Sequence, residues 1–514
     1  MKRNSVLVGT LWLMIAGIVT RLLGFVYRIY LSGLIGSEGM GLYQLISPVY
    51  FLLFTICSAG CQTAISQLVA AENAHGHTHN MKRILWSCLL PSTFLGVILC
   101  FFTRQYAPWI ASSLLHDERA VQGIRILCMG LPFCITSTCF KAYFHGIQRM
   151  DVPAIEQVIE QLFRMAVIYF LSPLLSHTNV AETCSYVVYG TVAGDLVSCL
   201  YTVIVYSSHR RHLPASSYRD PFPHLLKPIL LVVIPVTGSR LLTQLLSTFE
   251  NIMLPTVLQH SGMSSSAALS IYGEFSGMVM PLIAFPSIIT GALSSNLLPL
   301  VAGAKAGGNY RLIHLSIHRS LRLTFLISFL FTAILGSLGL MIGDLLYPGT
   351  QAGSLLQLLA FFCPFFYLQS TLGGLLNGSG LQNQVFLYQL LASGLRIFIL
   401  LTFGPHYGFS AFLLGMLTSL VLSSILSLWK ILSTYHMKLS LLKGLGLPLL
   451  SGLATFLLLR WAAHSPAFHL QSSLPALLLA CFTGCLIYLS ALCLSGSLTK
   501  KDLQEVLKLV KHKT

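Results

Sequence analysis

Apolar segments about 20 residues long follow one another along almost the whole sequence, and this is the length that a helix needs to cross the hydrocarbon core of a bilayer. Only 9% of the residues are charged, whereas soluble proteins average about 25%. The sequence therefore predicts an all-α, polytopic membrane protein with about fourteen transmembrane helices. The expected spans are 9–31, 43–71, 84–103, 121–146, 154–174, 185–206, 228–258, 269–300, 317–343, 351–377, 384–402, 409–430, 447–464 and 475–497.

The basic residues between these segments predict the orientation of the chain, because Lys and Arg in short loops favour the cytoplasmic side. One set of alternating loops is rich in them, whereas the opposite set holds little beyond Arg104, Arg119 and Arg125. We therefore expect both termini of this multi-pass protein in the cytoplasm. The net charge of +16 lies in loops rather than on one basic face, so no nucleic-acid partner is expected. The basic loops hold Lys82, Arg83, Arg149, Arg210, Arg211, Arg219, Lys227, Lys305, Arg311, Lys438, Lys443 and the tail from Lys500 to Lys513.

An internal repeat divides the expected spans into two halves. A shift of the chain by 232 residues, with no gap, superposes a proline, a glycine, a glutamine and an arginine on identical residues. We expect two parallel six-helix lobes, related by an axis along the membrane normal, at 1–227 and 228–443. Two further spans and a basic cytoplasmic tail occupy 444–514. The matched residues are Pro132 and Pro364, Gly146 and Gly378, Gln157 and Gln389, and Arg164 and Arg396.

Several other kinds of protein are disfavoured by what the sequence contains. Lys2 and Arg3 precede an apolar run too long for a signal peptide, so we expect a retained first span. The thirteen cysteines are expected to serve in packing, and the loop from His75 to His79 lacks a closing set of metal ligands. No Gly-rich phosphate loop or catalytic set is found, so neither an enzyme, a cofactor nor a metal is expected.

The first expected span carries two arginines, and a guanidinium at the bilayer centre costs roughly 2.5 to 17 kcal/mol. Arg21 and Arg28 follow a helical spacing with Gly17 and Gly24, so the four residues share one face. We expect this small, cationic face to turn away from lipid, into a watery or protein-lined interior. Arg21 is the stronger candidate for substrate binding, because Arg28 lies near the end of the span and can reach the interface.

The seventh and eighth expected spans supply further candidates. Arg240 and Gln244 lie on one polar face of the seventh span, with Glu250 beside it, and this span is the repeat partner of the first. We therefore expect Arg240 to face Arg21 across a cavity between the lobes. Glu274, in the eighth span, is a candidate for countering the arginines or for coupling to an ion or a proton.

The remaining charged residues inside spans have structural alternatives. Glu160 and Arg164 are four residues apart and can neutralise each other on one helix. Arg396 is the repeat partner of Arg164, and Ala392 stands at the position equivalent to Glu160. A coupling or structural role therefore stays open for Glu160, Arg164 and Arg396. Lys141, Glu156 and Asp195 lie near expected span ends, where burial costs less.

Arginines that line a cavity predict an anionic substrate, because a guanidinium binds phosphate and pyrophosphate oxygens in a bidentate manner. A multidrug cation antiporter requires acidic residues to dominate inside the membrane, and here they do not. A membrane scaffold without transport activity has no need of buried arginines. Both alternatives are therefore disfavoured.

The segments Thr20–Arg28 and Ile35–Tyr43, together with Leu68–Ala70, carry a resemblance that extends over essentially the whole chain. The sequence resembles the polysaccharide exporters of the multidrug/oligosaccharidyl-lipid/polysaccharide (MOP) superfamily. Within that superfamily it is similar to the stage V sporulation protein B group, relatives of the MurJ-type lipid II flippases. Six plus six helices with two extra C-terminal spans is the MurJ-like arrangement.

This resemblance implies a flippase that moves undecaprenyl-pyrophosphate-linked sugars across the bacterial cytoplasmic membrane by alternating access, for spore cortex peptidoglycan. The implied partners are this lipid-linked anionic oligosaccharide, the lipid bilayer and enzymes of cell-wall synthesis. Arg21 and Arg28 match functional arginines of the first span in MurJ-type proteins. The second span has no arginine, and the eighth has Glu274 instead, so another cargo, such as a teichoic or capsular unit, stays open. The resemblance also implies a groove for the lipid tail at the last two spans.

Overall fold

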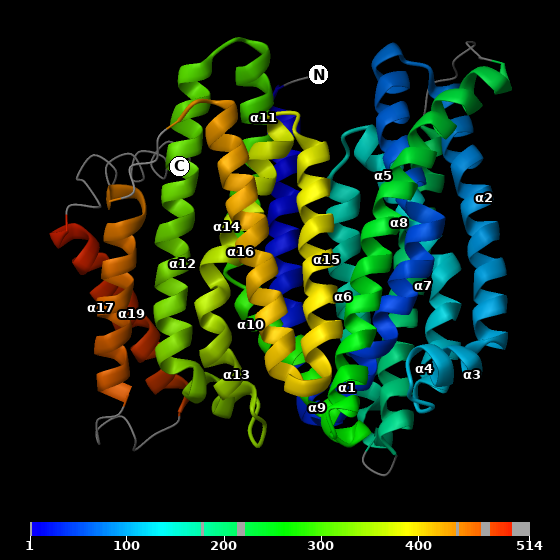
Figure 1. Cartoon of the computed structure of the whole chain (residues 1–514). Coiled ribbons are helices and arrows are strands. Elements are labelled where there is room, and N and C mark those ends of the chain that lie inside the picture. The colour runs from blue at the N-terminus through cyan, green and yellow to red at the C-terminus, as the bar shows by residue number, and fades with distance from the viewer. Residues whose placement is uncertain (1–2, 176–178, 213–220, 438–441, 464–472, 496–514) are drawn as a thin grey trace. The chain divides into compact units, whose positions relative to one another are not determined.

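The computed structural model describes residues 3–175, 179–212, 221–437, 442–463 and 473–495, and in this part of the chain the regular structure is entirely helical (Figure 1). Thirteen of the described helical stretches are long and apolar enough to cross a membrane. The prediction of an all-α polytopic membrane protein is therefore confirmed. The helices in the first half are α1 (Arg3–His75), α2 (Thr78–Gln105), α3 (Ala107–Trp109), α4 (Ala120–Leu127), α5 (Leu131–Gly146), α6 (Asp151–Leu175), α7 (Val180–Arg211) and α8 (Phe222–His260). They are followed by α9 (Ser265–Tyr272), α10 (Met280–Ala284), α11 (Ser287–Ala306), α12 (Tyr310–Leu346), α13 (Ala352–Leu359), α14 (Cys363–Gly378), α15 (Gln382–Tyr407), α16 (Phe409–Thr434), α17 (Leu447–Ala463) and α19 (Leu474–Leu494).

Helix α1 contains the first two expected spans in one run of 73 residues. A straight helix of this length would extend about 110 Å, more than three times the thickness of a bilayer core. The chain bends at Gly36, whose backbone angles are φ 67° and ψ −176°. Only glycine adopts such angles readily, because it has no Cβ. Gly36 therefore makes the turn between two spans that the sequence alone places on either side of a short loop.

The eighth expected span is broken rather than continuous. It consists of α9, a π-helical turn at Gly273–Val279, α10 and α11. Pro281 and Pro286 lie within or beside the breaks, and proline removes a backbone donor from a helix. The two prolines therefore account for the breaks on either side of α10.

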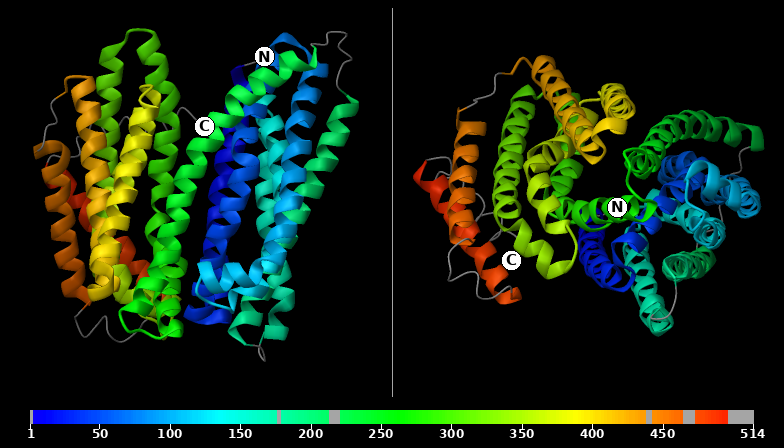
Figure 2. Two further views of the ribbon diagram at one scale, coloured as in Figure 1. Left: turned by 45° about the vertical axis from the view of Figure 1, so that its right-hand side comes forward. Right: turned by 60° about the horizontal axis from the view of Figure 1, so that its bottom comes forward.

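The chain forms two compact units that do not follow a single cut in the sequence. Unit 1 comprises Met1–Gly273 with Gly404–Gly408, and unit 2 comprises Glu274–Phe403 with Phe409–Thr514. In unit 2, an apolar core joins α11, α12, α14 and α16, and α17 packs along α12 with α19 beside it (Figure 2). The lobe boundaries expected from the repeat are defined by symmetry along the sequence, whereas these units are defined by compactness. The lobe boundaries therefore stay a prediction.

The repeat of 232 residues is visible in equivalent glycine contacts. A Cβ added to Gly146 would lie 2.9 Å from the Cβ of Val69. A Cβ added to Gly378 would lie 3.1 Å from the Cβ of Val301. Both partners are related by the same shift, so the two halves build this helix crossing in the same way. This one helix contact therefore agrees with the offset read from the sequence, and the two-lobe organisation stays a prediction.

The same shift relates Gly41 to Gly273. Within unit 1, each of these glycines packs against the segment of the chain that carries the other. A Cβ on Gly41 would overlap the carbonyl oxygen of Leu269, and a Cβ on Gly273 would overlap that of Ser37. Ser37 and Gly41 of α1 are thus packed backbone to backbone against Leu269 and Gly273. Glycine is required at both positions, because any side chain would push the two segments apart.

We predict that Gly41→Ala lowers the free energy of unfolding by about 1–3 kcal/mol, the usual cost of overpacking. Gly33→Ala is the matched control on the same helix, because a Cβ there meets no atom within 4 Å. It should be neutral or stabilising by up to about 1 kcal/mol, since alanine favours helix. Thermal and denaturant unfolding in detergent micelles measures both. Equal stability of the two variants would contradict the close contact at Gly41.

Candidate functional site

One face of α1 in unit 1 is open and carries the two arginines predicted to bind substrate. Arg21 is exposed and Arg28 is half-buried. Neither makes a hydrogen bond or ion pair with any residue that the structure describes. A Cβ on Gly17 would meet no atom within 4 Å, and one on Gly24 would meet only the side-chain amide of Gln161, at 3.9 Å. The face that the sequence groups together is therefore uncovered within unit 1.

Arg240 on α8 is a second exposed arginine without a hydrogen bond or ion pair among the described residues. A Cβ on its neighbour Gly238 would also meet no atom within 4 Å. On the same helix, Gln244 donates a long hydrogen bond of 3.4 Å to Thr248, which in turn donates to the carbonyl of Pro48 at 3.3 Å. The part of this polar face around Arg240 is therefore exposed. The part around Thr248 helps to hold α8 on α1.

The position of Arg240 relative to Arg21 can be followed through the contacts of α8. Thr248 contacts Pro48, and a Cβ on Gly60 would overlap Thr237, so Arg240 lies beside the second half of α1. Arg21 lies on the first half, before the bend at Gly36. That the two arginines face one shared cavity stays a prediction.

The acidic candidates of the seventh and eighth spans lie in buried positions. Glu250 on α8 is 8% exposed. Glu274, in unit 2, accepts a hydrogen bond of 3.2 Å from the backbone N–H of Gln351, the residue that precedes α13. A carboxylate at a helix N-terminus satisfies backbone donors there and is favoured by the helix dipole. Glu274 therefore has a structural role in unit 2, and its role in substrate binding stays a prediction.

The pair expected from the spacing of Glu160 and Arg164 is present in α6. The two side chains are joined at 2.5 Å between Oε1 and a guanidinium nitrogen. Arg396, the repeat partner of Arg164, instead donates a hydrogen bond of 3.1 Å from Nε to Ser419. The two arginines of the repeat thus have different partners, as the alanine at position 392 predicts.

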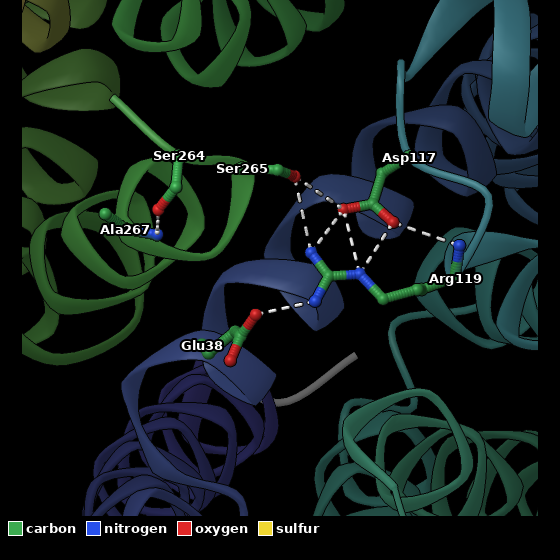
Figure 3. A network of polar contacts seen from close by, with 6 residues as sticks. All are labelled: Glu38, Asp117, Arg119, Ser264, Ser265 and Ala267. Carbon is green, nitrogen blue, oxygen red and sulfur yellow. Dashed lines mark hydrogen bonds and ion pairs between the residues drawn. The ribbon is translucent and has the colours of Figure 1, made fainter. Parts of the chain in front are cut away.

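A polar network in unit 1 was not among the predicted sites (Figure 3). The guanidinium of Arg119, in the loop before α4, binds Glu38 of α1 at 2.6 Å and Asp117 at 2.7 Å. It also donates a weak hydrogen bond of 3.4 Å to Ser265, the first residue of α9. Hydrogen bonding to Asp117 and then to Glu38 raises the pKa of Arg119 above its usual value. In the sequence, Arg119 is only a loop charge and Glu38 only a member of the segment Ile35–Tyr43. Nothing in their spacing indicates that they pair.

This network lies next to the glycine contact between α1 and α9. Glu38 is two residues beyond the bend at Gly36, and Ser265 begins the helix that packs on Gly41. Ser264 caps that helix by accepting a hydrogen bond of 3.3 Å from the N–H of Ala267 (Figure 3). Arg119 therefore ties the bend of α1 to the start of α9 within unit 1.

Unit 2 contains an apolar cavity of about 490 Å³ between α12, α14, α16 and α17. Its walls are almost entirely hydrocarbon, which suits an aliphatic or isoprenoid chain rather than a polar group. Phenylalanine side chains from three of the helices line it. Its lining includes Phe329, Phe361, Phe365, Ile425, Leu453 and Phe456.

Comparison with known proteins places the chain in a class and then in a family. The fold is that of MOP-superfamily transporters. It matches a structure of the lipid II flippase MurJ in an inward closed conformation with a TM-score of 0.70, at 14% identity, over 93% of this chain and 97% of that one. It also matches an inward-facing multidrug resistance MATE family transporter with a TM-score of 0.66, at 16% identity, over 81% of this chain and 94% of that one.

The family is established from the sequence. The family model described as polysaccharide biosynthesis protein matches residues 6–305, more than half of the chain. Stage V sporulation protein B of Bacillus subtilis (strain 168) is 29% identical over 439 residues, which cover 83% of each protein. The chain belongs to the polysaccharide biosynthesis protein family, as its resemblance predicts. Its relatives are transporters rather than enzymes.

We predict that Arg119→Ala lowers the free energy of unfolding by about 3 kcal/mol, because it leaves the buried carboxylate of Asp117 without its cation. Arg149→Ala is the matched control, since Arg149 pairs with Asp151 where both side chains are more than 40% exposed. The control should cost less than about 1 kcal/mol. Denaturant unfolding in detergent measures both. Equal losses would show that the Arg119 network is no stronger than a surface pair.

Proposed function

We propose that this protein is a flippase that carries a polyprenyl-pyrophosphate-linked sugar precursor, similar to lipid II, across the bacterial cytoplasmic membrane by alternating access. The observation that carries the proposal is a set of three arginines inside membrane spans that have no anionic partner among the described residues: Arg21, Arg28 and Arg240. Both termini lie in the cytoplasm in this proposal. Its product serves spore cortex peptidoglycan, and enzymes of cell-wall synthesis are its partners.

The contrast between paired and unpaired cations supports an anionic cargo. Arg119, Arg164 and Lys141 each have a carboxylate within 3.1 Å. A cation in a membrane span that lacks such a partner carries an uncompensated cost, which an anionic ligand removes on binding. The planar guanidinium matches two oxygens of a pyrophosphate at once, which an ammonium does not. Arg21, Arg28 and Arg240 are therefore assigned to the diphosphate of the cargo.

The apolar cavity of unit 2 supports a lipid-linked cargo. Its volume of about 490 Å³ lies within the range of about 300–1,000 Å³ that is usual for ligand pockets. The hydrocarbon lining accepts several isoprene units but no sugar, so we assign part of the polyprenyl tail to it. The rest of the tail stays in the bilayer. This assignment places the tail at α12 and α17, near the last two spans, where the family resemblance implies a groove.

A second cargo is supported by the family to which the chain belongs. Its family model is described as polysaccharide biosynthesis protein, which is broader than peptidoglycan. A polyprenyl-pyrophosphate carrying a teichoic or capsular unit presents the same diphosphate and the same tail. The two cargoes differ in the sugar alone, so the arginines do not distinguish between them.

We predict that Arg21→Ala lowers the initial rate of flipping by about tenfold or more, since one charge-assisted hydrogen-bonded contact contributes about 1.5–3 kcal/mol. The assay uses the full chain in proteoliposomes with fluorescent lipid II, and it follows exposure of the sugar to the outer leaflet. Arg210→Ala, at the exposed end of α7, removes the same charge elsewhere and should flip like wild type.

Equal rates for Arg21→Ala and wild type would remove the arginine mechanism. No movement of lipid II by wild type, together with movement of a lipid-linked teichoic precursor, would favour the second cargo. Arg21→Lys should be intermediate, because it keeps the charge but loses the bidentate contact.

A further inference from the structure

The interior of unit 1 holds a cluster of five ionisable side chains from three neighbouring helices. Lys141 comes from α5, Asp195 comes from α7, and Glu156, Glu160 and Arg164 come from α6. Glu156 is 0% exposed and Asp195 is 5% exposed. None of these five residues is needed to explain the binding of a diphosphate on the open face of α1.

The carboxylate of Glu156 is only half satisfied. Its Oε1 binds the ammonium of Lys141 at 3.1 Å and accepts a short hydrogen bond from Ser198. Ser198 and Ser137 lie 2.6 Å apart through their hydroxyls. The other oxygen, Oε2, is buried and has no hydrogen-bond partner among the described residues. A buried carboxylate oxygen without a donor is costly unless another species binds it.

The rest of the cluster lies further along α6 and on α7. Arg164 pairs with Glu160 at 2.5 Å, while its buried Nε has no hydrogen-bond partner in the described part of the chain. Asp195 accepts a hydrogen bond of 2.7 Å from the hydroxyl of Tyr50. A Cβ on Gly130 would lie 2.8 Å from the same carboxylate, so the site is tightly enclosed.

The charges of this cluster do not balance. Glu156, Glu160 and Asp195 supply three carboxyl groups, against two cations from Lys141 and Arg164. The other titratable groups that face it are tyrosines, cysteines and histidine, with Arg28 at its edge beside Tyr27. With all three carboxylates ionised, these five side chains carry one net negative charge, and two of the carboxylates, Glu156 and Asp195, are buried. These other groups are Tyr27, Tyr43 and Tyr50 of α1, Cys134 and His145 of α5, and Cys199 and Tyr201 of α7.

The repeat shows that the fold itself does not need these charges. The positions 232 residues after Lys141, Glu156 and Glu160 are Gly373, Tyr388 and Ala392. Unit 2 therefore builds the equivalent pair of helices, α14 and α15, without an ion pair at these positions. A buried charge cluster that one half of a repeat has and the other half lacks indicates a function confined to unit 1.

We propose that this cluster binds one exchangeable proton, shared between Glu156 and Asp195, and that its uptake and release are coupled to the transport cycle. The second part rests on the proposed function. The proton comes from water: a hydronium ion protonates one carboxylate and leaves as water. Carboxyl groups that interact titrate as a set rather than one by one, so the proton is assigned to the cluster and not to one residue.

A proton fits this site better than a metal cation. The ammonium of Lys141 already occupies the position on Glu156 where a cation would bind. Among the described residues, no group of three or more His, Cys, Asp or Glu side chains is placed to hold a metal ion. A metal cation would also add positive charge beside the ammonium of Lys141. Protonation of a carboxylate instead removes the uncompensated negative charge.

The first test reads protonation without any transport. Infrared difference spectroscopy of the full protein in lipid bilayers follows the carbonyl band of protonated carboxyl groups as pH is varied. We expect a band that titrates in wild type and is lost in Glu156→Gln. Glu182→Gln is the control, because Glu182 is an exposed carboxyl at the start of α7. A band unchanged in Glu156→Gln, Glu160→Gln and Asp195→Asn would overturn the proposal, as would one that responds to sodium but not to pH.

A second variant keeps the test open should Glu156→Gln fail to fold. Lys141→Met removes one of the two cations, so the carboxyl band should persist to higher pH, by about one pH unit or more. An unshifted band in a folded Lys141→Met protein would contradict the shared site.

The coupling is tested separately in proteoliposomes. The rate of flipping of lipid II by wild type should change at least severalfold with an imposed pH gradient, and Glu156→Gln should lose this dependence. Flipping by wild type that ignores the gradient would overturn the coupling. If wild type moves no lipid-linked cargo at all, the proposed function fails, whereas the infrared experiment still decides whether the proton site exists.

Discussion

The structure depends on one constraint: a charged side chain within a bilayer must be paired, reach water or meet a ligand. The described residues show the first two solutions, and the proposed function invokes the third. Arg119, Arg164 and Lys141 are paired with carboxylates, and Arg149 pairs outside the membrane with Asp151. Arg21, Arg28 and Arg240 have no such partner among the described residues and lie on faces that are open within unit 1. The paired cations hold the fold, and the proposed function assigns the other three to the cargo.

Packing of the backbone supplies the second element of the account. Glycines at positions related by the 232-residue repeat allow helices to touch without side chains between them, at Gly146 and Gly378 and again at Gly41 and Gly273. The pair at Gly41 and Gly273 joins the beginning of the second span to the beginning of the eighth. The chain passes into unit 2 directly after Gly273, so a rigid contact and the boundary of a compact unit lie side by side in sequence.

The membrane class, the repeat and the pairing of Glu160 with Arg164 could be predicted from the sequence, because each depends on local hydrophobicity, a fixed offset or the spacing of a helix. The bend that merges two spans into α1 could not, since it depends on a single glycine dihedral at Gly36. The network of Arg119 was also missed, because its partners come from positions 38 and 265 and are brought together only by the fold. The place of Arg21 and Arg240 in apolar spans makes them candidates, but only the structure shows that neither pairs with a described residue.

The most direct measurement of the central claim is equilibrium binding, by native mass spectrometry, of undecaprenyl pyrophosphate and of undecaprenol to the full protein. The two lipids share a tail and differ in the diphosphate. If the unpaired arginines receive that group, wild type binds the pyrophosphate at least about tenfold more tightly, a difference of about 1.4 kcal/mol. The triple variant Arg21→Ala, Arg28→Ala and Arg240→Ala then binds the two lipids equally. A wild type without preference, or a triple variant that keeps it, would contradict the account.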